Sequence, residues 1–238
     1  MDLPQWSSNT WDSGSVFDIL EKSFKTIQLK SYDGTTVHVN KALLVFFSKY
    51  YRAALTRNFS EANKNIFDVE LSGEHLKLFT TWLHSGKIEE PVAPKGVCVC
   101  ETYVRLYIFA EQTEILALRR KVIGYLASAP LPKYDTVALI LANQPESSPL
   151  RKHVLRSYIN HWTPEGDTED NYLESVERDT EGVLPGFMYK LLVGVANREE
   201  VDPKRCACCH RQCRYHEHES TEEVNENSRL FKDTDEDE

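Results

Sequence analysis

The sequence contains no hydrophobic run long enough to cross a bilayer. A transmembrane helix needs about 20 consecutive apolar residues, and no segment of the 238 residues approaches that length. Residues 1–24 also lack the basic and apolar regions of a signal peptide. We therefore expect a protein without membrane contact in the cytoplasm, the nucleus or both, where cysteines stay reduced or bind metal.

Basic stripes are absent as well, and acidic side chains are in excess. The net charge is −9, and residues 199–238 account for −7 of it. Because neutralisation of phosphates by Lys and Arg dominates nucleic-acid affinity, we expect no binding to DNA or RNA. Residues 219–238 contain few core-forming side chains and are predicted to be a disordered acidic tail.

Motifs typical of enzymes are missing. No segment matches a phosphate-binding glycine loop, a dinucleotide fingerprint, a nucleophile elbow or a zincin helix. Adjacent acids such as Glu89 and Glu90 are expected to be solvated rather than to form a catalytic pair. No internal repeat of 20 to 50 residues is present, which argues against a solenoid or propeller. We expect a protein that is not an enzyme.

Residues 26–56 contain two different hydrophobic periods. Residues 26–39 alternate apolar and polar positions on both sides of "DG", which predicts a β-hairpin. Residues 41–56 repeat apolar positions every three or four residues. They predict either one long helix or two short helices that are broken near Ser48.

The rest of the chain is predicted to be mainly helical. A strand is expected at 66–71, then a helix capped by Ser72 and ended by Gly86. Helical spacing returns at 104–108, 115–126, 134–142, 150–162 and 186–196. Pro130 and Pro132 are expected to bound the first structural unit. Residues 163–182 are a polar insertion that favours no helix.

Three segments carry a family resemblance. They are "VHVNKALLVFFSKYYRAALTRNFSEA" (37–62), "FTTWLHSGKI" (79–88) and "LYIFAEQTEILALRRKVIGYL" (106–126). Together they resemble the BTB/POZ family, in particular the BTB proteins of filamentous fungi. The resemblance implies an α+β fold in which residues 16–128 form a small sheet of three or five strands flanked by helical hairpins. An all-helical extension (132–200), a Cys/His-rich segment (201–218) and the acidic tail (219–238) would follow.

The resemblance implies a protein-interaction module rather than an enzyme. Many relatives form homodimers through their first helices, and Leu43, Leu44, Phe47 and Tyr51 could provide such an apolar face here. The same spacing is also typical of ordinary core residues. The chain departs from the family at Thr26, where an acidic residue is common, and at Asn40 and Lys41, where a His-Lys or His-Arg pair is common.

Some BTB relatives are substrate adaptors for cullin ubiquitin ligases. They contact the cullin scaffold through a hydrophobic residue, any residue and an acidic residue after the second helix. Phe59, Ser60 and Glu61 occupy the matching place here. An exposed aromatic anchor beside a carboxylate would suit that contact. Alternatively, Phe59 closes the helical hairpin and Glu61 is solvated.

The segment "CACCHRQCRYHEH" (206–218) contains four of the six cysteines and three of the eight histidines. A structural zinc ion needs four Cys or His ligands, for which Cys206, Cys209, Cys213, His216 and His218 are candidates. The resemblance implies that Cys213, His216 and His218 belong to a common fungal pattern. Reduced or redox-active thiols beside Arg205, Arg211 and Arg214 are an equally open interpretation.

Three functional hypotheses remain open from the sequence. The first is a BTB interaction module that dimerises or serves as an adaptor for a cullin ubiquitin ligase. The second is a nuclear scaffold or transcriptional co-regulator that does not bind a cullin. The third is a zinc-binding or redox-sensing protein in which the BTB part only dimerises the chain.

Overall fold

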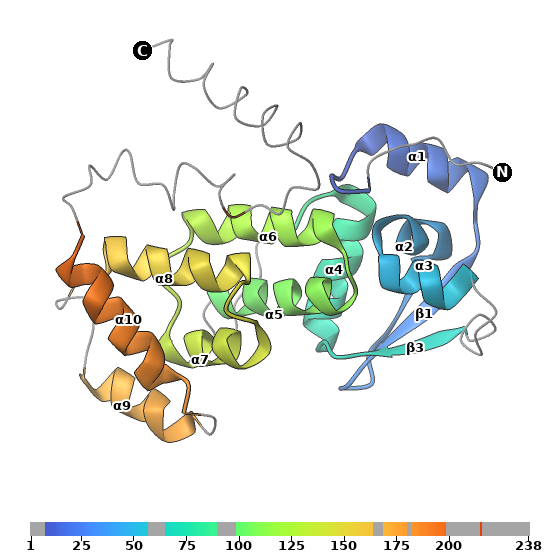
Figure 1. The fold of residues 1–238 in the computed structure, drawn as a ribbon. Helices are drawn as coiled ribbons and strands as arrows, with labels where there is room; N and C mark the ends of the chain where they lie inside the picture. The colour runs from blue at the N-terminus through green and yellow to red at the C-terminus, as the bar shows by residue number, and fades with distance from the viewer. Residues whose placement is uncertain are drawn as a thin grey trace, which may run out of the picture. The chain divides into compact units, whose positions relative to one another are not determined.

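A computed structural model describes residues 8–56, 65–89, 99–163, 169–179, 182–198 and 215 (Figure 1). These described residues form ten helices and one three-stranded sheet, so the predicted α+β class is confirmed. The chain divides into two compact units, Met1–Val122 and Ile123–Glu238. None of the helices in the described ranges is both long and apolar enough to cross a membrane.

The sheet of the first unit is built around the predicted hairpin. Strands β1 (Thr26–Ser31) and β2 (Thr36–Asn40) are antiparallel, and Gly34 in the turn has a positive φ of 87°. Strand β3 (Ile66–Val69) lies parallel to β1 on its other side, giving the order β2-β1-β3. The alternation in β1 buries Ile27 and Leu29 against the helices.

Two short helices follow the hairpin, α2 (Lys41–Phe47) and α3 (Lys49–Thr56). The break between them lies at Ser48, which is fully buried. Its hydroxyl donates to the Thr113 carbonyl at 2.5 Å and accepts from the Tyr51 backbone N–H at 3.0 Å. The structure therefore selects the prediction of two helices, because a contact 65 residues away holds the serine at the junction.

Caps set the ends of the other helices of this unit. Asp12 caps α1 (Ser13–Lys22) by accepting from the Ser15 N–H at 2.8 Å. Ser72 caps α4 (Gly73–Ser85), and Gly86 ends it in the left-handed conformation with φ 69°, so both predicted boundaries are confirmed. Helices α5 (Val99–Gln112) and α6 (Leu116–Ser128) follow.

The core of the first unit contains a group of packed aromatic rings. Trp82 of α4 is fully buried, and its ring centroid lies 5.4 Å from that of Phe47 and 6.1 Å from that of Phe79. Phe79 also meets Phe109 of α5 at 4.9 Å. These contacts join α2, α4 and α5, and Figure 1 shows α4 between the other two helices.

The described part of the second unit is helical. It contains α7 (Tyr134–Asn143), α8 (Pro149–His161), α9 (Glu169–Arg178) and α10 (Leu184–Ala196). Helix α10 packs against α7 and α8, and α9 packs against α7. In α10, Gly194 allows a close approach, because a Cβ there would lie 2.3 Å from the Ile159 side chain.

The expectation that residues 163–182 form no helix was wrong, because α9 lies within them. The ring of Tyr172 packs on Tyr134 of α7 at 5.4 Å, and Arg178 donates to Asp135 at 2.6 Å. The stability of a helix with so narrow an apolar stripe depends on packing against a neighbouring helix, and the local composition does not reveal that packing.

Candidate functional site

Most of the predicted site residues lie outside the described residues. These are the candidate cullin contact (Phe59, Ser60 and Glu61) and the candidate metal ligands (Cys206, Cys209, Cys213, His216 and His218). Both remain predictions. Of the Cys/His-rich segment, Tyr215 is the residue that the structure describes, and its side chain is buried.

The predicted dimer residues belong to the core. Leu43 and Leu44 are fully buried, and Phe47 and Tyr51 are each 2% exposed. Tyr51 packs its ring against Phe67 of β3 at 5.8 Å. These four side chains are therefore occupied within their own chain and offer no surface to a second copy. Any interface between copies would have to use other residues.

Two of the three residues that depart from the BTB pattern also have structural roles. The Asn40 side chain caps α2 by accepting from the N–H groups of Ala42 and Leu43 at 2.9 and 3.1 Å. Its amide donates to the Ser23 carbonyl at 2.7 Å. Thr26 begins β1 and pairs with Asn40 in the sheet register. These residues therefore join the hairpin to the helix that follows it.

In the second unit, Tyr215 contacts a buried histidine. The ring centroids of Tyr215 and His153 lie 4.9 Å apart and their planes are inclined by 72°, an edge-to-face arrangement. His153 lies in α8, on the same buried face as Leu150 and Val154. The Cys/His-rich segment is thus attached to α8 at one identified point.

Burial determines the chemical form of His153. Its Nδ1 atom has no hydrogen-bond partner among the described residues. The ring is 2% exposed. Loss of hydration lowers the pKa of His153 to about 4, partly opposed by a backbone hydrogen bond with Leu126. At neutral pH the ring is therefore uncharged.

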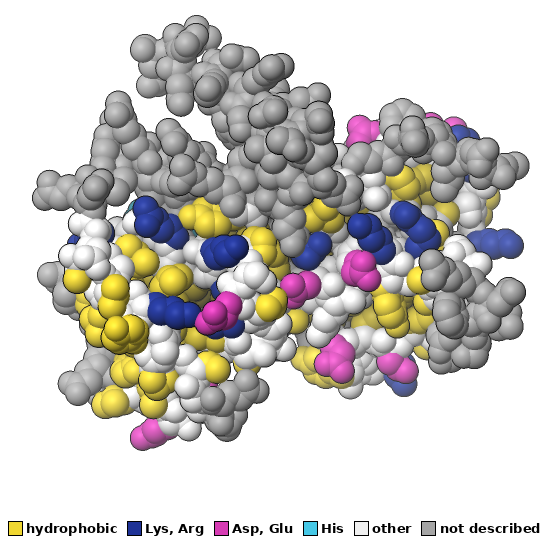
Figure 2. Space-filling view, in the orientation of Figure 1, with side chains coloured by type: hydrophobic (Ala, Val, Ile, Leu, Met, Phe, Trp, Pro, Cys, Tyr) yellow, Lys and Arg dark blue, Asp and Glu magenta, His cyan; other side chains and the backbone are white. Residues whose placement is uncertain are grey.

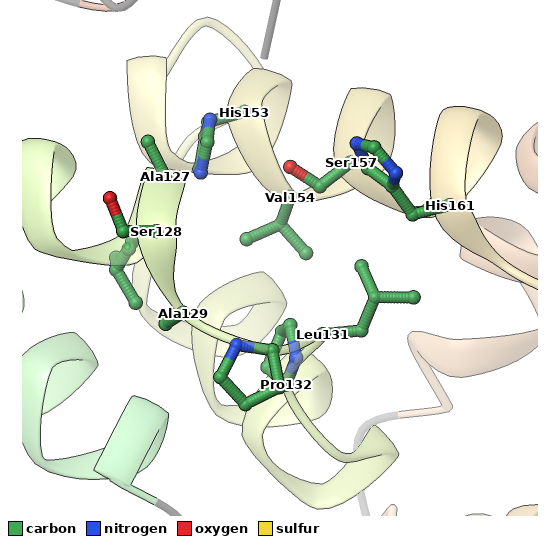
Figure 3. Close-up of a pocket in the computed structure, with 11 residues that line it drawn as sticks. Ala127, Ser128, Ala129, Leu131, Pro132, His153, Val154, Ser157 and His161 are labelled. Atoms are coloured by element: carbon green, nitrogen blue, oxygen red, sulfur yellow. The ribbon is translucent and has the colours of Figure 1, made fainter. Parts of the chain in front are cut away.

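A cavity of about 300 Å³ lies beside this histidine, within the second unit. Figure 3 shows Ser157 and His161 of α8 on one side and Ala129, Leu131 and Pro132 on the other. The Tyr158 hydroxyl donates to the Pro132 carbonyl and so holds the connection after α6 against α8. The walls are largely apolar, which suits an apolar group more than a charged one.

Helix α10 exposes several large apolar side chains. Tyr189, Leu192 and Val193 are 71%, 58% and 44% exposed. Their spacing of three and four residues places them on one face of the helix. Figure 2 shows hydrophobic side chains gathered over α9 and α10 on the face in view. Lys190 lies between them in the sequence and pairs with Glu146 at 2.8 Å. Its charged side chain is therefore directed toward the loop that precedes α8.

The described residues contain no group of three or more His, Cys, Asp or Glu side chains that could hold a metal ion. Cys100 is fully buried in α5, and Cys98 lies outside the described residues. The sequence did not single out His153, although a histidine on the apolar face of a helix at 150–162 is a visible signal. Compared with models of protein families and with curated proteins, the chain matches none.

Proposed function

We propose that the chain is a non-catalytic protein-interaction module of the BTB/POZ type that serves as a substrate adaptor for a cullin ubiquitin ligase. The observation that carries the proposal is the order of elements in the first unit. An antiparallel hairpin, a pair of short helices and a strand parallel to the first one form a small sheet flanked by helices. This order supports the proposal, because the resemblance implies a small sheet of three or five strands flanked by helical hairpins.

The residues of the BTB-like motifs support the proposal through their structural roles. In "SKYYRAAL", Ser48 forms the helix junction, and Arg52 donates to the carbonyls of Val45 and Phe46 at 3.1 and 2.7 Å. Those carbonyls belong to the last turn of α2, so Arg52 satisfies acceptors that the helix leaves open. Because these motif residues build the pair α2 and α3, we expect the same motif in other proteins that form this helical pair.

The cullin contact rests on the place of Phe59 and Glu61 in the sequence, shortly after α3. We expect Phe59 to fill an apolar pocket on the cullin and Glu61 to fix its orientation. The test is a pull-down of a purified cullin scaffold by the full chain. Phe59→Ala and Glu61→Arg should each weaken binding at least about tenfold, the size of an interface hot spot.

Matched controls make this test specific. Tyr32→Ala truncates an aromatic side chain that is 72% exposed, and Glu70→Arg reverses an exposed charge in the same unit. Both controls should bind the cullin like the unchanged chain. No binding by the unchanged chain, or equal binding by all variants, would refute the adaptor role and favour the nuclear scaffold.

Self-association belongs to the same proposal and needs exposed residues. Phe17 of α1 is 61% exposed, and the resemblance assigns dimer contacts to the first helices. Phe17→Ser should therefore shift the chain toward the monomer in size-exclusion chromatography with light scattering. Tyr32→Ser is the control and should leave the mass unchanged. A monomer before any substitution would contradict self-association while leaving the cullin test valid.

A further inference from the structure

The cavity of about 300 Å³ in the second unit has no part in the functions proposed above. One of its walls is formed by residues 126–132, at the end of α6 and in the connection that follows. The other wall is formed by four residues of α8, namely His153, Val154, Ser157 and His161. A volume of this size lies at the lower end of the range that small-molecule sites occupy.

The side chains around this cavity carry no formal acid or strong base. None of the described residues that line it is Asp, Glu, Lys or Arg. A neighbouring cavity of about 270 Å³ in the same unit is different, since its lining includes Lys133, Asp135, Glu174 and Arg178. Burial of an ionised group without a partner of opposite charge is costly. The first cavity therefore suits an uncharged molecule.

His153 adds a polar but neutral surface to the inner end of the cavity. Its ring is 2% exposed, and burial lowers its pKa to about 4. At pH 7.5 the imidazole is therefore uncharged, with one nitrogen that donates and one that accepts hydrogen bonds. The ring can face a neutral ligand without presenting it with a cation.

The cavity extends from the protein surface to the interior. Ser128 and His161 are exposed at its rim, whereas Ala127 and Val154 are buried. Ser157 lies four residues before His161, on the same side of α8. Figure 3 shows both residues on the α8 wall. A ligand can thus enter past the rim and place its apolar part against the buried side chains, with a serine hydroxyl beside it.

We propose that this cavity binds a small, uncharged and mainly apolar molecule that carries a hydroxyl group, such as an alkylated phenol. Ala127, Leu131 and Val154 would contact its hydrocarbon part. Ser157 would bond to its hydroxyl, because two hydroxyl groups can each donate and accept. This proposal is independent of the BTB assignment and of cullin binding.

The first test compares three probes of similar shape by ligand-observed NMR titration of the purified full chain at pH 7.5. They are 4-ethylphenol, which is neutral, 4-ethylbenzoate, which is an anion, and 4-ethylbenzylamine, which is a cation at this pH. The phenol should bind at least about tenfold more tightly than either charged probe. Equal or tighter binding of a charged probe would overturn the proposed ligand class. No binding of the phenol would overturn the site.

The second test fills the cavity from its two walls. Ser157→Phe and Ala129→Phe should each lower the affinity for 4-ethylphenol at least about tenfold, because the new ring would occupy the space of the ligand. Ser147→Phe is the matched control, since Ser147 is an exposed serine in the loop before α8, and its affinity should be unchanged. Unchanged affinity in a folded cavity variant would overturn the site.

A third measurement needs no variant. Nuclear Overhauser effects between 4-ethylphenol and the unchanged chain should appear at the methyl groups of Ala127, Ala129 and Val154, which line the cavity. Effects at methyl groups elsewhere in the chain, without these three, would overturn the assignment of the site.

Discussion

Lowering the pH from 7.5 to 5.0 should cost the folded chain about 2 kcal/mol through His153 alone. The pKa of this histidine is about 4 in the folded protein, against 6.5 for the free side chain, because the buried ring loses its hydration. Between these two values the unfolded chain binds more protons than the folded chain, so acid favours unfolding. The full shift of about 2.5 pKa units corresponds to about 3 kcal/mol, and about 2 kcal/mol of it is lost by pH 5.0.

The direction follows from the sign of the shift. A histidine with a lowered pKa contributes its stability fully above about pH 6.5 and loses it as the pH falls toward about 4. Because the ring is 2% exposed, solvent does little to reduce the effect. Asp33 and His75 also have lowered pKa values, so acid destabilises the chain through several groups at once. A variant is needed to isolate His153.

The assay is urea unfolding of the unchanged chain and of His153→Gln at pH 7.5 and 5.0. The glutamine does not titrate, so the difference in unfolding free energy between the two proteins should change by about 2 kcal/mol over this range. His161→Gln, which replaces an exposed histidine of the same helix, should follow the unchanged chain. A difference that is the same at both pH values would refute the burial of the neutral ring.

Three further predictions concern the first unit. Gly86→Ala should lower the unfolding free energy by about 2–4 kcal/mol, since its left-handed φ disfavours a side chain and its Cβ would lie 2.5 Å from the Trp11 ring. In a Trp11→Ala background, urea unfolding should show a loss of only about 1 kcal/mol, and an equal loss in both backgrounds would contradict the contact. Gly73→Ala should cost about 1–3 kcal/mol, because its Cβ would lie 2.2 Å from Thr35 Oγ1, and Thr35→Gly should reduce that cost in a double-mutant cycle. Asp33→Asn should lower the melting temperature at pH 7 by weakening the bond that the carboxylate accepts from the Gly73 N–H at 2.7 Å. Because this bond is the largest cause of the low pKa of Asp33, the difference in melting temperature from the unchanged chain should shrink as the pH falls below about 4. A difference in melting temperature that does not change with pH would contradict this prediction.

Local patterns predicted the elements whose ends are set by neighbouring residues. The hairpin at "DG" and the caps at Ser72 and Gly86 all depend on contacts within a few residues, and the structure has each of them. The break at Ser48 was left open between one helix and two, because the deciding partner is Thr113. Helix α9 was missed for the same reason, since its packing partners lie on α7.

The candidate sites show the same division between local and distant information. Helical spacing singled out Leu43 and Tyr51, but spacing cannot separate an interface from a core, and the ring of the sheet residue Phe67 packs against Tyr51 within the chain. The ligand-rich segment at 206–218 was visible because its cysteines and histidines are adjacent in the sequence. The buried histidine that contacts Tyr215 of this segment lies some sixty residues earlier.

Sequence spacing finds ligands that share one loop, and the short gap between the Cys206–Cys209 and Cys213–His216 pairs is an objection to a site made from these four. What marks His153 in the structure is a buried Nδ1 atom without a hydrogen-bond partner among the described residues. The ring is buried only once α8 is packed within the second unit, so the order of residues in the sequence does not reveal it.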